Sequence, residues 1–454
     1  MTAPPQQLAG AKASVYFRSL GCPKNQVDSE VMLGTLALGG YALAERIDDA
    51  DVVVINTCSF IESARQESID AILAVAELRE TGRLRALVVA GCLPQRYGGE
   101  LSRELPEVDA FVGTGEFPRI AEILDGALAG RKGGVYVESG RTYLYEARDP
   151  RILVGPTHSA YLKIAEGCDR ICAFCAIPAI RGRFQSRSLE SLEAEARQLA
   201  AAGVRELNLV AQDSTSWGKD LAGRPRLDAV LRRLDDVEGL DWIRLLYLYP
   251  SAVTDELIEV LASGRRVLPY VDVPLQHASD AMLRAMKRGT TADRQRRLVE
   301  RLRAGIPELA IRTTFIVGFP GETDADFESL CEFVRETRFD RVGVFRYSDE
   351  EGTAARDLPG KVSKRAARER QRALLDLLRE LQAEKLAELI GREVEVLVDA
   401  GGRDRAVARM RSQAPEIDGN VLLRGAAKTG DLLRARITGV HGPDLTAELL
   451  WGRS

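Results

Sequence analysis

The stretch "AYLKIAEGCDRICAFCAIPAIRG" (residues 160–182) joins a strand-like run to three closely spaced cysteines, Cys168, Cys172 and Cys175. Five further strand-like runs follow, with helical segments between them: "ELNLVAQD", "WIRLLYLYP", "PYVDVPLQ", "IRTTFIVGFP" and "RVGVFRYS". Six alternating strand and helix units predict a parallel α/β barrel that is closed or partly closed. The active site of such a barrel lies at the carboxyl ends of its strands, and the three cysteines follow the first strand.

Three thiolates are fewer ligands than a closed metal site needs. Structural zinc takes four ligands, and the nearest additional candidate, His158, lies in a predicted linker. A 4Fe-4S cluster can be held by three thiolates, which leaves its fourth iron open to another ligand. The C-x3-C-x2-C spacing lets one short loop present all three sulfurs to one cluster. We interpret Cys168, Cys172 and Cys175 as the ligands of such a cluster, with zinc as the alternative.

A second incomplete set of cysteines precedes the first. Cys22 ends "VYFRSLGC", Cys58 ends "DVVVINTC" and Cys92 ends "ALVVAGC", at intervals of 36 and 34 residues. Each thiol therefore follows one strand of a βαβ series, and the carboxyl ends of parallel strands lie along one edge of the sheet. The spacing predicts that the three thiols meet there, although small buried cysteines at strand ends are the alternative.

The chain is long enough for three domains, because 454 residues allow about 150 for each. We expect an N-terminal parallel-sheet α/β domain over residues 14–147 and a central partial (βα)6 barrel with a trailing helix over residues 155–387. The stretch "EARDPRILVGPTHSA" (146–160) is typical of a linker. Short β-like runs separated by glycines predict a small β-barrel over residues 388–454.

Composition places the chain among ordinary globular proteins. Its net charge is −4, with 45% hydrophobic and 29% charged residues, so nucleic-acid binding would need a local basic patch. It shows neither a secretory signal nor 18 consecutive apolar residues, and we expect a cytoplasmic protein that does not bind membranes. Seven cysteines in a reducing compartment are free, metal-bound or catalytic. Cys331, in helical "DFESLCEFVRE", has no partner spacing and is predicted to be a core residue.

Five other residues are candidates for cofactor binding. Gln212 and Asp213 follow the second barrel strand, and Gly318 and Glu322 follow the fifth, at the expected catalytic edge. Phe174 lies between two of the cysteines. Each residue also has a structural interpretation, since "GFPGET" is compatible with a turn before a helix and an apolar side chain can simply shield a cluster.

With three cysteines after the first barrel strand, three more before it and a C-terminal β-barrel, the chain resembles the radical S-adenosylmethionine methylthiotransferases. The resemblance extends from residue 14 to the end and is carried by these stretches: "LGCPKNQVDSE", "NTCSFIESARQES", "GCLPQRY", "AYLKIAEGCDRICAFCAIPAIRG", "YLYP", "PLQH", "GFPGET", "RVGVFRYSDEEGTAA" and "APEIDG". These stretches are most similar to the branch of the family that modifies a ribosomal protein. The sequence departs from the usual "GGE" after the second barrel strand, where it has "AQD" (211–213).

The resemblance implies an activity and its cofactors. Enzymes of this branch methylthiolate the β-carbon of an aspartate in small-subunit ribosomal protein S twelve, as a post-translational modification. One S-adenosylmethionine is the radical source and another the methyl donor. The resemblance assigns one 4Fe-4S cluster to Cys168, Cys172 and Cys175, where S-adenosylmethionine is cleaved to a 5′-deoxyadenosyl radical. A second 4Fe-4S cluster, which carries the sulfur, is assigned by the resemblance to the three N-terminal cysteines.

The resemblance also implies a residue role, a partner and a domain type. Phe174 corresponds to an aromatic residue that lies beside the adenine, and an electron donor such as a flavodoxin or a ferredoxin supplies electrons. The C-terminal barrel corresponds to an OB-like TRAM domain.

Two other functions remain open on the sequence. A transferase that methylthiolates adenosine in tRNA would share every cysteine, and a non-catalytic iron-sulfur electron carrier would use the same thiolates. Residues 392–454 contain ten Lys and Arg against nine Asp and Glu, which does not form the positive surface that tRNA binding requires. We therefore expect tRNA to be the less favoured partner, and "APEIDG" (414–419) to form part of a protein-docking surface, with an ordinary exposed turn as the alternative.

Overall fold

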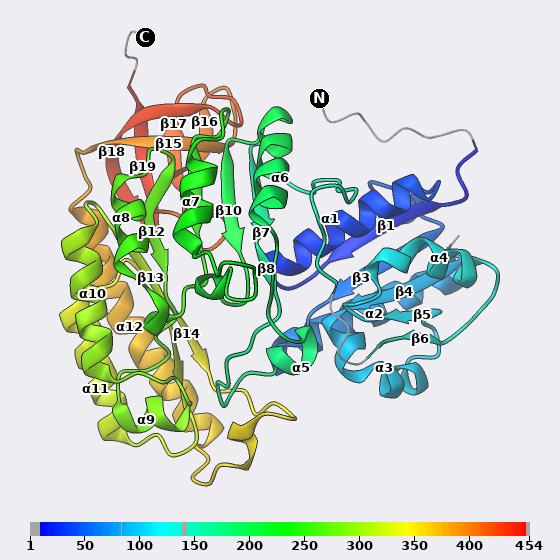
Figure 1. The fold of residues 1–454 in the computed structure, drawn as a ribbon, viewed down its shortest axis with the longest axis horizontal. Coiled ribbons are helices and arrows are strands. Elements are labelled where there is room, and N and C mark those ends of the chain that lie inside the picture. The colour runs from blue at the N-terminus through cyan, green and yellow to red at the C-terminus, as the bar shows by residue number, and fades with distance from the viewer. Residues whose placement is uncertain (1–9, 83, 139–142, 451–454) are drawn as a thin grey trace.

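The computed structural model describes residues 10–82, 84–138 and 143–450, which form three main sheets (Figure 1). The N-terminal sheet is parallel, with the order β2-β1-β3-β4-β5-β6. Its strands are β1 (Ser14–Ser19), β2 (Ala42–Leu43), β3 (Val52–Thr57), β4 (Ala86–Gly91), β5 (Ala110–Val112) and β6 (Gly134–Tyr136). Its helices are α1 (Pro23–Leu38), α2 (Glu62–Thr81), α3 (Cys92–Glu104) and α4 (Ile120–Leu128).

Helices cover both faces of this sheet. The alternation of side chains along β3 sends Val52 and Val54 into a core with α1 and α4, and Val53 and Ile55 into a core with α2 and α3. A strand buried on both faces has an uninterrupted apolar sequence, which "VVVI" provides. The parallel α/β unit predicted from the sequence is thereby confirmed.

The central sheet is also parallel, in the order β14-β13-β12-β11-β10-β7. Its strands are β7 (Ser159–Lys163), β10 (Glu206–Val210), β11 (Trp242–Leu245), β12 (Val267–Asp272), β13 (Ala310–Val317) and β14 (Arg341–Arg346). Among the described residues β7 and β14 do not pair, so the six-unit barrel is open, as the partial barrel prediction requires. Its helices are α5 (Ile177–Arg181), α6 (Leu189–Ala201), α7 (Leu227–Asp235), α8 (Asp255–Ser263), α9 (Asp280–Ala285), α10 (Ala292–Gly305) and α11 (Asp324–Thr337).

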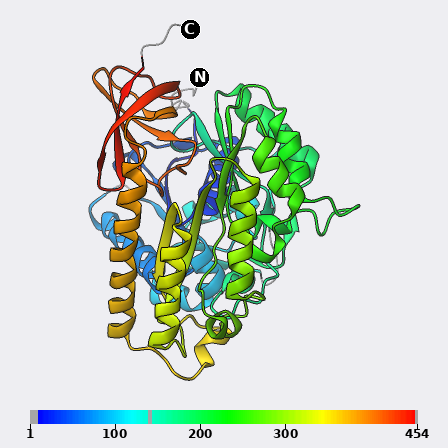
Figure 2. The ribbon, with the colours of Figure 1, turned by 90° about the vertical axis from the view of Figure 1, so that its left-hand side faces the viewer.

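A long helix leads from this sheet to the C-terminal barrel (Figure 2). In α12 (Lys364–Ala387), Leu374 packs in the central core and Leu386 in the core of the barrel. The barrel is closed and has the order β15-β16-β17-β19-β18, as predicted. Its strands are β15 (Glu393–Ala400), β16 (Arg405–Met410), β17 (Val421–Arg424), β18 (Leu432–His441) and β19 (Asp444–Leu449).

Buried ion pairs join the three units. Arg409 of the barrel lies 2.7 Å from a carboxylate oxygen of Glu206 in β10, and both side chains are fully buried. Arg151, within the predicted linker, donates to Glu30 of α1 and Glu195 of α6 at 2.6 Å each. The linker therefore has no regular secondary structure before Ser159, where β7 begins, and is fixed at Arg151 by buried carboxylates.

The stretch "APEIDG", predicted to form part of a docking surface, is only partly exposed in the structure. Ala414 and Asp418 are buried, and Asp418 accepts a hydrogen bond from Tyr270 of β12 at 2.5 Å. The buried part of this turn therefore fixes the barrel on the central sheet, and only Glu416 and Ile417 are exposed.

Among the described helices, none combines the length and apolar character that crossing a bilayer requires.

Candidate active site

The N-terminal cysteines lie at the carboxyl ends of three adjacent strands, as predicted. Cys22 follows β1 and is the N-cap of α1, Cys58 follows β3 directly, and Cys92 opens α3 immediately after β4. Gly21 allows the loops of Cys22 and Cys58 to approach, because a Cβ on Gly21 would lie 2.6 Å from the Cβ of Cys58. We call these three residues the N-terminal triad.

The second set of cysteines lies in the loop between the short strand β8 (Ala165–Glu166) and α5. The backbone N–H of Cys168 donates to the carbonyl of Gly182 at 3.1 Å, which closes the loop, and β8 pairs with β9 (Gln185–Ser186). The N–H of Cys175 donates to the carbonyl of Cys172 at 3.1 Å, in a tight turn. We call Cys168, Cys172 and Cys175 the central triad.

Both triads line one cavity of about 440 Å³ between the N-terminal and central units. All six of these cysteines contribute to its walls, and most of the remaining lining residues come from the strand ends and loops of the central sheet. Cys331 does not line this cavity; it is buried in the central core, which confirms the prediction for it. Residues that are 36, 34 and more than 70 positions apart in the sequence thus line one cavity.

The thiols of each triad lie close enough to affect one another's ionisation. Burial raises the pKa of Cys92 to about 12; Arg181 opposes this rise, and the neighbouring thiols Cys58 and Cys22 add to it. Burial likewise raises the pKa of Cys175 to about 12, with a contribution from the other two central cysteines. Three thiolates crowded together in a buried site are unfavourable unless a cation such as iron neutralises them.

Each triad has its own buried arginine, which donates a hydrogen bond to one of its thiols. Arg181 Nε lies 3.3 Å from Cys92 Sγ, and Arg288 Nη1 lies 3.2 Å from Cys172 Sγ. Arg181 is in α5, directly after the central triad, but it contacts a cysteine of the N-terminal triad. The central unit therefore supplies a hydrogen-bond donor to the N-terminal triad.

Arg181 is held by a buried network of charges at the boundary of the two units. It donates to Asp28 of α1 at 2.6 Å, and Lys163 of β7 also pairs with Asp28 and donates to Glu166 at 2.7 Å. Although burial alone would raise it, Lys163 and Arg181 hold the pKa of Glu166 well below its ordinary value. Gln212 donates to the same carboxylate at 2.5 Å, so the network reaches the wall of the cavity.

Three of the five predicted cofactor-binding residues line the cavity. These are Phe174, Gln212 and Asp213. Gln212 Oε1 is buried with no hydrogen-bond partner among the described residues, and it is available to accept one from a ligand. Asp213 pairs with Arg170 at 2.7 Å, and this arginine stacks on the ring of Tyr249.

The other two predicted residues lie outside the cavity wall. Glu322 is fully buried, and its carboxylate accepts hydrogen bonds from His277, from Arg370 and from the backbone N–H of Gly318. Gly318 lines a neighbouring groove rather than this cavity. The contacts of Glu322 are those of a residue that fixes the carboxyl end of β13.

Lys24, Tyr247 and Gln276 are among the residues of the cavity wall that sequence reasoning missed. Tyr247 and Gln276 follow strands of the central sheet and have φ values of +62° and +73°, which non-glycine residues rarely adopt. Residues held in such conformations cluster at functional sites. Lys24, two residues after Cys22, lines the same cavity. All three residues lie in stretches that carry the family resemblance, "LGCPKNQ", "YLYP" and "PLQH". These stretches could have identified them as candidate site residues.

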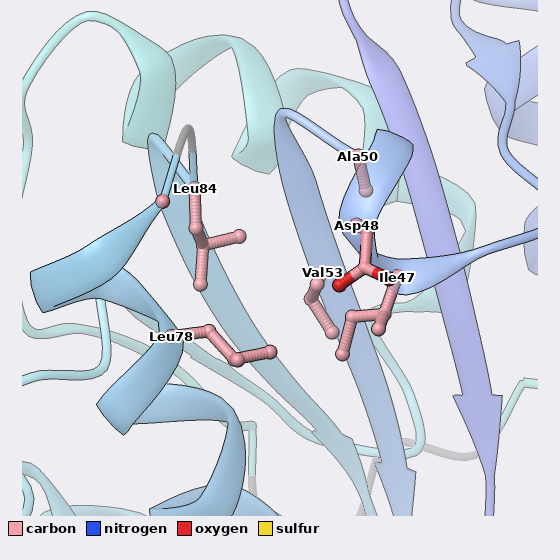
Figure 3. Close-up of a pocket in the computed structure, with 7 residues that line it drawn as sticks. Ile47, Asp48, Ala50, Val53, Leu78 and Leu84 are labelled. Atoms are coloured by element: carbon pink, nitrogen blue, oxygen red, sulfur yellow. The ribbon is translucent and has the colours of Figure 1, made fainter.

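Another cavity, of about 560 Å³, lies on the N-terminal unit (Figure 3). Its walls are mainly aliphatic, with Val53, Leu78 and Leu84 facing Ile47, and Asp48 is the one charged side chain drawn there. It holds no cysteine and offers no chemistry comparable to that of the triads.

Within the described ranges, no three His, Cys, Asp or Glu side chains surround a position for one metal ion. The ligands of a 4Fe-4S cluster bind different irons, so their sulfurs do not converge on one point. This absence therefore leaves the assignment of clusters to the two triads a prediction.

Three family models match the chain: "Uncharacterized protein family UPF0004" over residues 14–113, "Radical SAM superfamily" over residues 162–334 and "TRAM domain" over residues 390–450. Among solved structures, the radical S-adenosylmethionine methyltransferase TsrM from Kitasatospora setae matches with a TM-score of 0.54 and 17% identity over 73% of this chain and 72% of that chain. The cobalamin-dependent radical enzyme OxsB matches with a TM-score of 0.51 and 13% identity over 82% of this chain and 56% of that chain. These two likenesses show the fold alone.

The sequence relatives are much closer. "Ribosomal protein uS12 methylthiotransferase RimO" of Sorangium cellulosum (strain So ce56) is 50% identical over 96% of this chain and 91% of that protein. The protein of the same name from Geobacter sulfurreducens is 47% identical over 98% of this chain and all of that protein, and that from Myxococcus xanthus is 48% identical over 96% and 92%. With such identity over nearly its whole length, the chain belongs to the RimO family of radical S-adenosylmethionine methylthiotransferases.

Proposed function

We propose that this protein attaches a methylthio group to the β-carbon of an aspartate in ribosomal protein uS12. The observation that carries the proposal is that two cysteine triads, each one ligand short of a closed site, face one cavity. An electron carrier would need neither the shared cavity nor the unpartnered polar atoms in its wall. The close relatives are named for the same activity on uS12.

The residues present suit two 4Fe-4S clusters and S-adenosylmethionine. Each triad combines three thiols with one arginine that donates to a sulfur. Iron would stabilise the deprotonated thiolates, although crowding and burial raise the pKa of these thiols. When bound, these groups supply a radical able to take hydrogen from an unactivated carbon, and a sulfur donor. We assign one cluster to Cys22, Cys58 and Cys92 and the other to the central triad.

Side chains of this protein would bind and orient S-adenosylmethionine. Gln212 Oε1 and Gln276 Oε1, both buried acceptors without a partner among the described residues, suit the amino group of S-adenosylmethionine. Phe174 offers an aromatic face to the adenine, and the Asp213–Arg170 pair presents polar groups on the same wall. Gly318 and Glu322, which lie outside the wall, are assigned the indirect role of fixing the end of β13.

The partners follow from the same proposal. The substrate uS12 would be modified in the cytoplasm, and an electron donor such as a flavodoxin or ferredoxin would reduce the central cluster. The C-terminal barrel has balanced charges, with ten Lys and Arg against nine Asp and Glu in residues 392–454, which disfavours tRNA.

The test is a direct comparison of substrates. Anaerobically reconstituted protein is incubated with S-adenosylmethionine, a reductant and a sulfur source, and with either purified uS12 or tRNA, and both products are analysed by mass spectrometry. We expect the methylthio group on an aspartate of uS12 and none on tRNA. Modified tRNA with unmodified uS12 would contradict the proposal.

A further inference from the structure

Lys24 is a buried lysine in the wall of the active-site cavity. It lies in the first turn of α1, two residues after Cys22, and its side chain is 8% exposed. The ammonium lies 3.3 Å from the centre of the Tyr247 ring, which comes from the central unit. Lys24 thus lies where the two units face each other across the cavity.

The charges around the cavity leave Lys24 without a carboxylate. Among the other cations in the wall, Arg170 and Arg181 each pair with a buried carboxylate, and Arg288 donates to a thiol and to a backbone carbonyl. No carboxylate of the described residues lies within ion-pair distance of Lys24, whose contact is the face of Tyr247. Burial opposes the charged ammonium, whereas Tyr247, the Cys22 thiol and Asp272 favour it. None of these places a carboxylate in ion-pair contact with Lys24, so the site still favours an incoming anion.

The backbone holds Tyr247 in a rare conformation beneath this ammonium. Its φ of +62° is costly for a residue with a bulky side chain. Its N–H donates to Asp272 at 3.2 Å, and its carbonyl accepts from the N–H of Ser214 at 3.0 Å. Asp272 forms its ion pair with Arg312 at 3.2 Å and acts on Lys24 only through its charge, from beyond ion-pair distance.

We propose that the Lys24 ammonium binds the carboxylate of the substrate side chain and so makes the enzyme select an acidic residue over its amide. This inference rests on the function proposed above and deepens it. A carboxylate held at Lys24 leaves the adjoining carbon inside the cavity that both triads line. Lys24 is a specificity-determining residue that binds substrate and leaves cluster assembly to the cysteines.

A structural role for Lys24, joining the units through Tyr247, predicts a different result. Loss of such a contact would weaken the binding of every substrate equally. Loss of a carboxylate-binding cation would instead remove the difference between an acidic and an amide side chain. The comparison of two substrates on two enzymes separates these roles.

The experiment uses reconstituted full-length enzyme and two forms of uS12, one with the target aspartate and one with asparagine in its place. Dissociation constants are measured for wild type, Lys24→Met, Lys24→Gln and the control Lys12→Met. Lys12 is an exposed lysine of the same N-terminal unit, outside the cavity. Iron content and the spectra of the clusters are recorded for each protein.

We expect wild type and Lys12→Met to bind the aspartate form at least about tenfold more tightly than the asparagine form, and both Lys24 variants to bind the two forms equally. A preference for aspartate that survives in Lys24→Met or Lys24→Gln would overturn the inference. So would variants that cannot be obtained folded with full iron content, because that result assigns Lys24 to the structure. If wild type itself neither binds nor modifies uS12, the proposed function fails instead.

Discussion

Replacing Arg181 by Gln is expected to lower the reduction potential of the cluster proposed at the N-terminal triad. Arg181 Nε donates to Cys92 Sγ at 3.3 Å, and its positive charge stabilises the more negative, reduced form of a cluster bound there. Arg288 makes the corresponding contact to Cys172, at 3.2 Å, in the central triad. Each arginine should therefore affect one cluster more than the other.

The size of the effect follows from the hydrogen bond. A bond that involves a charged group contributes about 1.5–3 kcal/mol. If about half of this differs between the oxidised and reduced forms, the change is about 1 kcal/mol, or about 40 mV for a one-electron couple. Arg181 also pairs with Asp28, and removing one member of a buried pair costs about 3–5 kcal/mol of stability. Arg181→Lys, which keeps the charge, is the milder companion variant.

The assay is a redox titration followed by electron paramagnetic resonance. To observe one cluster at a time, Arg181→Gln is placed in a background whose central triad is changed to Ala, and Arg288→Gln is placed in a background without the N-terminal triad. We expect each substitution to lower the potential by about 40 mV, and Arg181→Lys to have the smaller effect. An unchanged potential in Arg181→Gln with full iron content would refute the reasoning.

Three further predictions concern other parts of the molecule. Arg409→Met should destabilise the attachment of the C-terminal barrel by about 3 kcal/mol, measured by chemical denaturation, because Arg409, together with Arg244, holds the pKa of Glu206 at about 2 although burial would raise it. Since this pKa lies below the ordinary 4.5, the ion pair of Glu206 contributes to wild-type stability above about pH 4.5, and this contribution is lost as the pH falls towards 2. A difference in stability between wild type and Arg409→Met that does not change with pH would contradict this prediction. Cys331→Ala should keep its iron and its turnover, and iron loss would add Cys331 to the ligands. Gln212→Leu should weaken S-adenosylmethionine binding about tenfold in equilibrium dialysis without loss of iron, and unchanged affinity would remove Gln212 from the site.

The positions of the cysteines at strand ends were predictable because they follow from local patterns. Cys22, Cys58 and Cys92 each end an apolar run, and the rules of parallel sheets place such residues on one edge. The strand and helix periods likewise predicted the three sheets. These features depend on residues that are close in the sequence or on connections of fixed handedness.

Contacts between the units were not predictable in the same way. Lys24 and Tyr247 are more than 200 positions apart, and their contact depends on how two separately folded sheets pack. The linker around Arg151 appeared irregular from its prolines, but its fixed position comes from the carboxylates of two other elements. Asp418 lies in a stretch with the composition of an exposed turn, and Tyr270 and Arg312 of the central sheet bury it.

The central claim is that two three-cysteine clusters divide the reaction between them, and cluster counting combined with product analysis tests it most directly. Reconstituted wild type should contain about eight irons and eight sulfides. Changing Cys22, Cys58 and Cys92 together to Ala should leave about four irons and retain cleavage of S-adenosylmethionine to 5′-deoxyadenosine, while methylthiolation of uS12 is lost. A triple variant that keeps its remaining cluster but loses both activities would contradict the account.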